Sequence, residues 1–460
     1  MQLRYRVSPF CAFAVLVAIG LAAPSFAQSK YVVTDLGTLG GTTNYPASIN
    51  NSGQVAGYST IAGGSLFSTG QFAYRTEPNQ PINPNTDSLG LLLGGTYSTA
   101  TGINNSGQVA SYTYFSSTFT EEASIATPGQ PLLGLGTFTA PLDSSLANGL
   151  NDLGQVVGAS NVPNTCTGYS TFHAYVTAAN GSVTAATDLG TLVPAPYTAC
   201  GFSSALAVNN AGDVVGSSSV TYGSFVQHAF LSIPGSAMQD LGTIGGPSTA
   251  NSFAYAINRS GQIVGQSYLA KEPSIYHAFL TTASGPMQDL GTLGGENSGA
   301  NDINTSGAIV GNSLLSDNET LHGFIYSGGT MQDLNNLIPA GTPWVIENAS
   351  AINDNGQIVG EGTYNGVSRG FRLDPVNMAF TNLLVELVSP NLGLNLAQQI
   401  TTALHVAAAL AEFELGHYSA AITQLNAFIT EITSIENAGH LSAANATMLI
   451  DAAQAIIAAL

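Results

Sequence analysis

The feature that most constrains this chain is a short motif that recurs along most of its length. We assign seven copies of the pattern Ala-x-x-(Ile/Leu/Val)-Asn-x-x-Gly, and the spacings between their glycines are 54, 47, 58, 49, 46 and 49 residues. The assigned alanines are Ala47, Ala100, Ala147, Ala205, Ala254, Ala300 and Ala349, and the asparagines are Asn50, Asn104, Asn151, Asn209, Asn258, Asn304 and Asn353. A repeat of this length fits a propeller blade better than a helical repeat.

Each repeat predicts four short strands. Asn-x-x-Gly between two apolar stretches is a tight turn in which the glycine takes a positive φ. In one repeat, residues 262–265 predict the second strand, residues 277–280 the third, and Asp-Leu-Gly at 289–291 the end of the fourth. Such units bury both faces and protect their edges when they close into a ring. We therefore predict a mainly β fold, a seven-bladed β-propeller over residues 28–376; a β-solenoid and two separate β domains are the alternatives.

Closure of the ring has two possible solutions. Residues 31–36 read as a strand with no blade before it, and they can complete the last blade, which contains residues 370–373. Residues 377–383 can fill the same place. The sequence does not choose between these two segments.

Three motifs recur in a fixed order: Asp-Leu-Gly-Thr-Leu-Gly-Gly at 289–295, Ile-Asn-x-x-Gly-x-Ile-Val-Gly, and His-Ala-Phe at 277–279. In these motifs the chain resembles the bacterial extracellular HAF-repeat family over residues 31–375. Repeat 2 departs from the pattern, with Ser-Leu-Gly at 88–90 and Ala-Ser-Ile at 123–125. The resemblance implies export and a repeated β architecture, and it implies no catalytic activity.

After residue 377 glycine becomes sparse and the apolar residues follow a helical period. One predicted helix face carries Leu396, Ile400, Leu404, Ala407 and Ala411. We predict a helical hairpin or three-helix bundle over residues 377–460, which forms a small all-α module separate from the ring.

Helix ends are marked inside this module. Gly416 and Gly439 stand where left-handed helix ends belong, and Ser442 is a candidate N-cap. Residues 420–429 and 449–457 resemble the FIMAH domain of secreted bacterial proteins. That resemblance implies an accessory module, which often accompanies carbohydrate-acting or adhesive domains.

The N-terminus reads as an export signal. Arg4 and Arg6 precede an apolar run at 10–23, and small residues at 25–27 suit a signal peptidase, so residues 1–27 are predicted to be removed. No later apolar stretch is long enough to span a membrane. The signal contains two of the eight basic residues and none of the 27 acidic ones, so the mature net charge is −21. A product this acidic repels nucleic acid and anionic membranes. We expect it to be secreted or extracellular, with the periplasm as the alternative.

Two cysteines remain after removal of the signal, Cys166 and Cys200. Both fall in long connections of repeat 3 that are expected to emerge on the same face of the ring. In an oxidising compartment such thiols pair, so we predict a disulfide between them. Two unpaired thiols are the alternative.

The polar residues that recur have a structural interpretation. Four histidines occupy the same place in successive repeats: His173, His228, His277 and His322. A catalytic group is needed only once, so we interpret them as hydrogen-bonding residues. The repeated carboxylates are Asp35, Asp188, Asp240, Asp289 and Asp333. One carboxylate per loop is too few for calcium, so a turn-stabilising role is favoured. We predict no catalytic residue, metal or cofactor from these motifs.

Aromatic residues recur just after the Asp-Leu-Gly elements. They are Tyr45, Tyr97, Phe138, Tyr197, Phe253 and Trp344. Such rings can stack on sugars, and Tyr45, Tyr97, Tyr197, Phe253 and Trp344 are the candidate ligand-facing residues. Packing between blades is the alternative, and we favour it.

The sequence as a whole favours a secreted, non-enzymatic binding or scaffold protein whose partner is a polysaccharide or a cell-surface component. The first alternative is an extracellular carbohydrate-active lyase or hydrolase on the same fold. It requires carboxylates that converge at one end of the channel, for which Glu121, Glu122 and Asp143 are the candidates. The second alternative is a purely structural matrix component.

Overall fold

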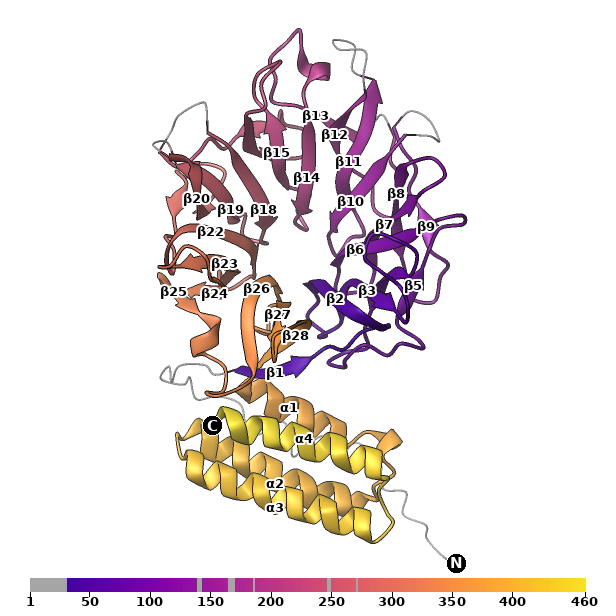
Figure 1. The fold of residues 1–460 in the computed structure, drawn as a ribbon, viewed down its shortest axis with the longest axis vertical. Helices are drawn as coiled ribbons and strands as arrows, with labels where there is room; N and C mark the ends of the chain where they lie inside the picture. Colours follow the sequence, from indigo (N-terminus) through magenta and orange to yellow (C-terminus); the bar gives the residue numbers. More distant parts are fainter. Residues whose placement is uncertain (1–30, 139–142, 164–169, 185–186, 246–249, 270–271) are drawn as a thin grey trace, which may run out of the picture. The chain divides into compact units, whose positions relative to one another are not determined.

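Each sequence repeat forms one four-stranded antiparallel sheet, and seven such sheets are arranged as blades around a central axis (Figure 1). The predicted seven-bladed β-propeller, followed by a helical module, is confirmed. The computed structural model describes residues 31–138, 143–163, 170–184, 187–245, 250–269 and 272–460. The described chain divides into two units, a propeller that extends to Leu383 and a helical unit that begins at Leu384.

The first strand of each blade lies nearest the axis (Figure 1). These strands are β2 (Gly40–Ile49), β6 (Tyr97–Ile103), β10 (Ser145–Leu150), β14 (Ser203–Val208), β18 (Ser252–Ile257), β22 (Gly294–Ile303) and β26 (Trp344–Ile352). In six blades the repeat alanine of this strand is fully buried, and the strand bulges directly after it. A methyl side chain fits where seven strands crowd together, and a bulge bends the strand there.

The first copy of the motif is shifted by one residue. Ala47 lies three residues before its asparagine, whereas the other alanines lie four before theirs. Pro46 pairs with Gly57 in the way that Ala147 pairs with Gly158. The assignment of Ala47 to the alanine position is therefore wrong, because proline fills the crowded site in this blade.

The second strands begin with two aliphatic residues, followed by glycine in six blades and by Ser111 in blade 2. They are β3 (Val55–Ile61), β7 (Val109–Phe115), β11 (Val156–Pro163), β15 (Val214–Ser219), β19 (Ile263–Leu269), β23 (Ile309–Leu315) and β27 (Ile358–Tyr364). Glycine is needed here because the first strand lies very close to this position. A Cβ on Gly265, for example, would overlap the carbonyl oxygen of Phe253 on the first strand. The two inner strands of the blade pack closely for this reason.

The outer half of each blade is shorter. The third strands are β4 (Gln71–Arg75), β8 (Thr120–Ala126), β12 (Ser170–Val176), β16 (Gln227–Ser232), β20 (Glu272–Thr281), β24 (Leu321–Ser327) and β28 (Val367–Pro375). The fourth strands are β5 (Ser88–Gly90), β9 (Leu133–Gly134), β13 (Asp188–Gly190), β17 (Gln239–Asp240), β21 (Gln288–Asp289), β25 (Thr330–Asp333) and, for blade 7, β1 (Tyr31–Asp35).

A serine two residues before the repeat alanine joins neighbouring blades. The serines are Ser98, Ser145, Ser203, Ser252 and Ser298. Each hydroxyl accepts a hydrogen bond of 2.8–3.0 Å from an alanine N–H on the third strand of the preceding blade. It also donates one of 2.5–2.7 Å to a glycine carbonyl near that blade's fourth strand. All five serines are almost completely buried, so these bonds replace water that the packed blades exclude.

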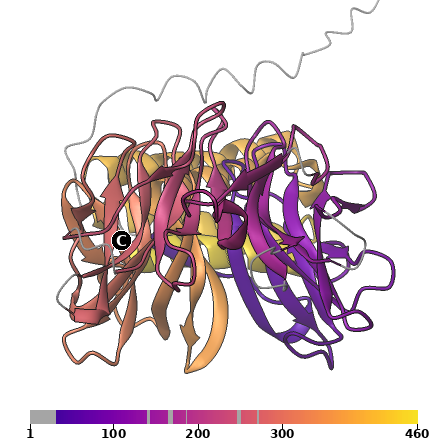
Figure 2. The same cartoon turned by 90° about the horizontal axis from the view of Figure 1, so that it is seen from above.

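The strands run between two faces of the propeller (Figure 2). The Asn-x-x-Gly turns join first to second strands on one of them, which we name the turn face. The connections between second and third strands, and those from one blade to the next, lie at the opposite end of the strands, which we name the loop face.

The ring is closed by the N-terminal strand. β1 pairs with β28 in antiparallel register, with Thr34 opposite Arg372 and Val32 opposite Asp374. The segment that closes the ring is therefore residues 31–35, and the sequence alone did not choose between this segment and residues 377–383. Residues 377–383 are helical instead and belong to α1 (Val376–Leu387).

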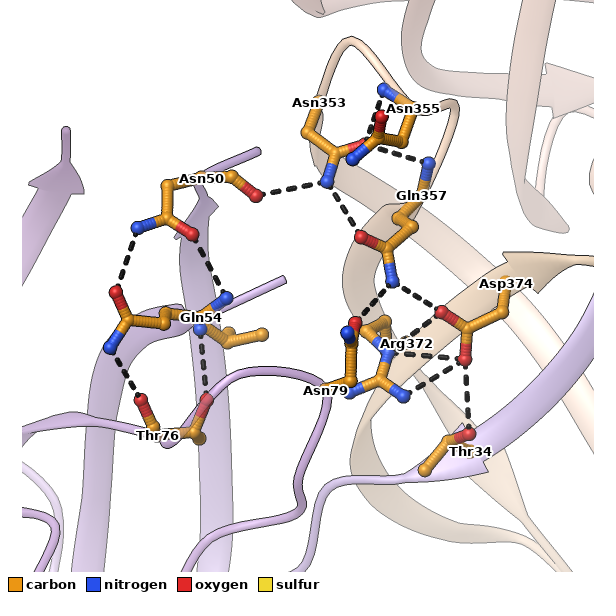
Figure 3. A network of polar contacts seen from close by, with 11 residues as sticks. Thr34, Asn50, Gln54, Thr76, Asn79, Asn353, Asn355, Gln357, Arg372 and Asp374 are labelled. Carbon is orange, nitrogen blue, oxygen red and sulfur yellow. Dashed lines mark hydrogen bonds and ion pairs between the residues drawn. The ribbon is translucent and has the colours of Figure 1, made fainter. Parts of the chain in front are cut away.

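A buried ion pair lies at this closure. Arg372 and Asp374 are each 3% exposed, and Nε of Arg372 lies 2.9 Å from Oδ1 of Asp374. Thr34 of β1 and Gln357 also donate hydrogen bonds to Asp374 (Figure 3). The Gln357 amide in turn accepts from Asn353 of the last Asn-x-x-Gly turn. Polar contacts therefore connect the closing strand to the turns at the axis.

The C-terminal module has one helix more than predicted. Its helices are α1, which spans the boundary between the two units, α2 (Leu396–Glu414), α3 (Tyr418–Asn437) and α4 (Ala443–Ala459), with a short 3₁₀ turn at Pro390–Leu392. Gly416 and Gly439 adopt φ of 76° and 74°, and the Ser442 hydroxyl accepts from the N–H of Asn445, so the predicted helix ends are confirmed. No helix in the described ranges is long and apolar enough to cross a membrane.

The apolar face expected to form the core of α2 is exposed instead. Leu396, Ile400 and Leu404 are 62%, 52% and 59% exposed, while Thr402 and Val406 are buried. A different side of α2, which includes small alanine and threonine residues, is buried. α2 packs against α3, and small side chains allow two helices to approach each other closely. The apolar period alone did not identify the packed side.

We expect Asp374→Ala to lower the free energy of unfolding by about 3–5 kcal/mol, because it leaves a buried guanidinium without its counter-charge. The double variant Arg372→Met with Asp374→Leu should recover most of this loss. Urea denaturation of the three proteins measures the effect. Equal stability of Asp374→Ala and the unmodified protein would contradict the role of this pair in closure.

Candidate functional site

The described propeller contains a cavity of about 330 Å³ where the seven Asn-x-x-Gly turns meet at the axis. Every blade contributes three consecutive residues to its wall: the last aliphatic residue of the first strand, the repeat asparagine and the residue after it. The volume lies at the lower end of the range of small-molecule sites. The cavity is therefore the candidate functional site of this fold.

The repeat asparagines form a closed ring of hydrogen bonds beneath this cavity. The side-chain amide of each asparagine donates to the backbone carbonyl of the asparagine in the next blade, over 2.9–3.5 Å. The last of these bonds runs from Asn353 to Asn50 and closes the circle (Figure 3). All seven asparagines are at most 6% exposed. In all seven repeats the asparagine therefore joins neighbouring blades at the axis.

The same asparagine also shapes its own turn. The Oδ1 atom of Asn304 accepts from the N–H groups of Ser306 and Ala308, at 3.1 and 3.0 Å. Gly307 follows with φ of 82°, which confirms the positive φ predicted for the turn glycine. One amide side chain therefore fixes a turn through its oxygen and a neighbouring blade through its nitrogen.

The residue after each asparagine differs between blades and lines the mouth of the cavity. The seven positions hold Asn51, Asn105, Asp152, Asn210, Arg259, Thr305 and Asp354. Six of them form a second, outer set of blade-to-blade bonds. The Asn105 N–H donates to Asp152 at 2.9 Å, for example, and the Thr305 N–H donates to Asp354 at 2.9 Å. The repeat motif leaves these positions unspecified, and they emerge from the sequence only when the residue after the repeat asparagine is compared across the seven turns.

Both carboxylates at the mouth are ionised. Burial by itself would raise the pKa of Asp152, but hydrogen bonds from Asn210 and Asn105 outweigh it and hold that pKa below its usual value. Burial also opposes ionisation of Asp354, whose pKa is nevertheless lowered by hydrogen bonds from Thr305 and Asn51 and by the positive charge of Arg259. These groups are acceptors held by amides, and they are not poised to donate a proton at neutral pH.

Arg259 interrupts the outer set of bonds. Its side chain is exposed at the mouth of the cavity, and no hydrogen bond or ion pair joins its guanidinium to another residue in the described part of the chain. A guanidinium has five N–H donors in a fixed plane and stays charged. Among the described residues that line these turns, Arg259 is thus the one at the mouth whose side-chain donors are not used by the ring.

The repeated histidines and aspartates pair with each other. His173, His228, His277 and His322 contact Asp188, Asp240, Asp289 and Asp333 through Nδ1 at 2.7–3.0 Å. Each pair links the third strand to the fourth strand of one blade. In three of them the aspartate also accepts from the N–H of a glycine two residues later, at 2.7–2.8 Å. The contacts agree with the structural interpretation of both residues.

The candidate aromatic residues do not lie at the cavity. Tyr97, Phe253 and Trp344 lie at the starts of first strands, Phe138 and Tyr197 lie in the connections before them, and Tyr45 lies in the middle of β2. Trp344 is 7% exposed and packs edge-on against Phe371, so it belongs to the core. Phe138 packs edge-on against Tyr175, and Phe253 is stacked near Tyr255. For these residues the packing role that we favoured is the one observed.

The candidate carboxylates of repeat 2 do not converge on the channel either. Glu121 and Glu122 lie on β8, two strands away from the axis, where they pair with Tyr114 and Thr113. Asp143 lies near the end of the connection into β10, two residues before that strand begins. In the described chain no group of three or more His, Cys, Asp and Glu side chains is placed to hold a metal ion.

A different carboxyl group stands out near the loop face. Glu361 is half-buried on β27, and burial, with the nearby charge of Glu347, raises its pKa to about 7. Its charge also raises the pKa of Tyr45 on the adjacent blade, after burial of that phenol. No sequence motif marks Glu361, since its environment is made by two blades that meet only when the ring closes.

Cys200 lies at the end of a 3₁₀ turn, Thr198–Cys200, in the connection between blades 3 and 4. Cys166 lies outside the described residues. The disulfide between them stays a prediction.

Comparison with known protein families and with curated proteins finds no match. Among solved structures the chain is similar to an acylaminoacyl peptidase from Pyrococcus horikoshii, with 10% identity and a TM-score of 0.42 over 70% of this chain and 49% of the peptidase. It is also similar to Trypanosoma rangeli sialidase, with 11% identity and a TM-score of 0.32 over 63% of this chain and 58% of the sialidase. The chain thus spans about half the length of these proteins, and similarity at this level supports no statement about shared chemistry. Fold and site together define a seven-bladed propeller with a polar cavity at its turn face.

We expect His277→Ala to lower the free energy of unfolding by about 1–2 kcal/mol and to leave ligand binding unchanged, because the pair with Asp289 joins strands inside a blade. The exposed His440→Ala is the matched control and should have no effect. Denaturation curves measure the change. A loss of binding at unchanged stability would contradict the structural role.

The raised pKa of Glu361 predicts a pH dependence. The folded state favours the protonated carboxyl, so the stabilisation is complete below the ordinary pKa of 4.5 and is lost as the pH rises through about 7. Glu361→Gln should therefore melt at a higher temperature than the unmodified protein at pH 8.5, with little difference at pH 4.5. Glu296→Gln, at an exposed position, is the control. A constant difference across this pH range would contradict the environment described for Glu361.

Proposed function

We propose that this protein is a secreted, non-enzymatic binding protein of the HAF-repeat type, and that its helical unit is a FIMAH-like accessory module. Its ligand is a sugar residue of an extracellular polysaccharide or of a cell-surface component. The propeller acts as a rigid ring that presents the polar cavity at the turn face. Export is supported by the predicted signal peptide and by the acidic, glycine-rich composition.

The proposal rests on the side chain of Arg259, which is not used in bonds between blades. Six of the seven residues at the mouth are committed to bonds between blades, and Arg259 is not. Amide and hydroxyl groups with one guanidinium offer the directional hydrogen bonds that a hydroxyl-rich ligand needs. The ring holds the neighbouring groups in place before binding, which reduces the entropy that binding has to overcome.

A glycan array probed with residues 28–460 tests this function. We expect binding to a limited set of glycans, with a loss of roughly tenfold or more in affinity for Arg259→Ala and a smaller loss for Arg259→Lys. Leu153→Ala is the matched control, because Leu153 is 55% exposed on a turn of the same face and should not contribute. Retained binding by Arg259→Ala would contradict the cavity as the site. Absence of any glycan binding would favour a purely structural matrix role.

One observation favours an extracellular carbohydrate-active enzyme as the second candidate. Glu361 and Glu347 form a pair of carboxyl groups in which one pKa is raised to about 7, the arrangement that suits a general acid beside a carboxylate. Release of reducing ends from the bound glycans, abolished by Glu361→Gln, would support this candidate over simple binding.

A further inference from the structure

Aromatic pairs recur on the first and second strands of several blades. In blades 1, 2 and 7 the pairs are Tyr45–Tyr58, Tyr97–Tyr114 and Trp344–Tyr364, with ring centroids 5.0, 4.9 and 5.4 Å apart. In each pair the two residues are direct cross-strand partners on the first and second strands. Such pairs stabilise a sheet, and this role is sufficient to explain them.

The pair in blade 4 differs because neither ring belongs to a strand. Tyr197 precedes β14, which begins at Ser203, and Tyr222 follows β15, which ends at Ser219. Their ring centroids are 4.7 Å apart and the planes differ by 10°, so the rings are stacked. Tyr197 is 46% exposed and Tyr222 40% exposed. This pair therefore stands outside the sheet and is exposed to solvent.

The backbone around the two tyrosines is held by hydrogen bonds. The N–H of Tyr197 donates to Pro194, and its carbonyl accepts from Cys200 at 2.9 Å. In the second connection the N–H of Ser224 donates to the carbonyl of Thr221, and that of Val220 to the carbonyl of Val226. The stacked rings are therefore ordered before any ligand arrives, and two rigid aromatic side chains lose little conformational entropy on binding.

The two connections that contain the pair, residues 191–202 and 220–226, have no charged residue. Asp213 is the only charged residue in the segment 191–226, and it lies on the turn face, where it accepts from Asn209. The hydroxyl side chains in these connections are Thr191 and Thr198 before β14 and Thr221 and Ser224 after β15, and Phe225 beside the pair is 97% exposed. A surface without cations, in a chain of net charge −19, does not attract polyanions. It also lacks the charged rim that would complement a protein partner.

We propose that Tyr197 and Tyr222 form a stacking platform for neutral pyranose units of an extracellular polysaccharide. The apolar C–H face of such a sugar packs on an aromatic ring, while its hydroxyl groups reach the serine and threonine side chains around it. The platform lies on the loop face, away from the cavity at the turn face. It shares the ligand class of the proposed function and depends on neither Arg259 nor the cavity.

Affinity electrophoresis of residues 28–460 tests the platform. The gels contain one soluble polysaccharide each: a mixed-linkage β-glucan, a galactomannan, dextran, alginate or polygalacturonate. We expect retardation by at least one of the three neutral polymers and by neither acidic one. Tyr197→Ala and Tyr222→Ala should each weaken that association roughly tenfold, whereas Tyr197→Phe should retain it.

Two control variants separate this site from the turn face and from nonspecific adhesion by exposed apolar side chains. Leu153→Ala, at an exposed position on the turn face, should leave retardation by the neutral polymer unchanged, and so should Phe119→Ala, whose ring is 80% exposed on blade 2. Melting temperatures of all variants should equal that of the unmodified protein. The proposal is overturned if no neutral polymer retards the protein, if Tyr197→Ala binds as well as the unmodified chain, or if Phe119→Ala loses as much affinity.

Discussion

The structure depends on one hydrogen bond that is repeated seven times, from an asparagine side chain to the backbone carbonyl of the asparagine in the next blade. The bond is buried at the axis, where losing it would leave an amide and a carbonyl without partners. It joins residues 46 to 58 positions apart, except at the closure, where Asn353 reaches Asn50 across 303 positions. Blade shape and blade assembly are thus encoded in the same side chain.

Because the asparagine performs both tasks, the residue after it is free to vary. Five blades place asparagine or aspartate there, and these continue the sideways bonds between turns. Blade 5 places Arg259 there and interrupts them. A repeat protein can acquire a single binding site when one position differs in one blade while the ring itself stays the same. A group that is repeated in every blade has a structural role instead. The histidine–aspartate pairs illustrate the second case, for they occur in four blades and lie inside each one.

The aromatic residues show the same contrast between a repeated structural feature and a single exposed site. Cross-strand pairs stabilise blades 1, 2 and 7, and the aromatic pair of blade 4 is exposed to solvent because neither of its rings belongs to a strand. The sequence identified Tyr197 as one of five equivalent aromatic candidates. Only exposure separates it from Trp344, which is buried against Phe371. Exposure is a property of the assembled blade, so local sequence could not rank the five.

The sequence by itself determined the number of blades, the turn chemistry and the place where strands give way to helices, because these follow from local φ preferences and from the period of apolar residues. It did not determine which segment closes the ring, since residues 31–36 and 377–383 were equally able to supply a strand. Tertiary structure decided in favour of β1, whose register with β28 covers the Arg372–Asp374 pair. Tertiary structure also determines which side of α2 is buried, leaves the side-chain donors of Arg259 unused and raises the pKa of Glu361. Each of these depends on groups far apart in the chain, which become neighbours only when seven blades meet around one axis.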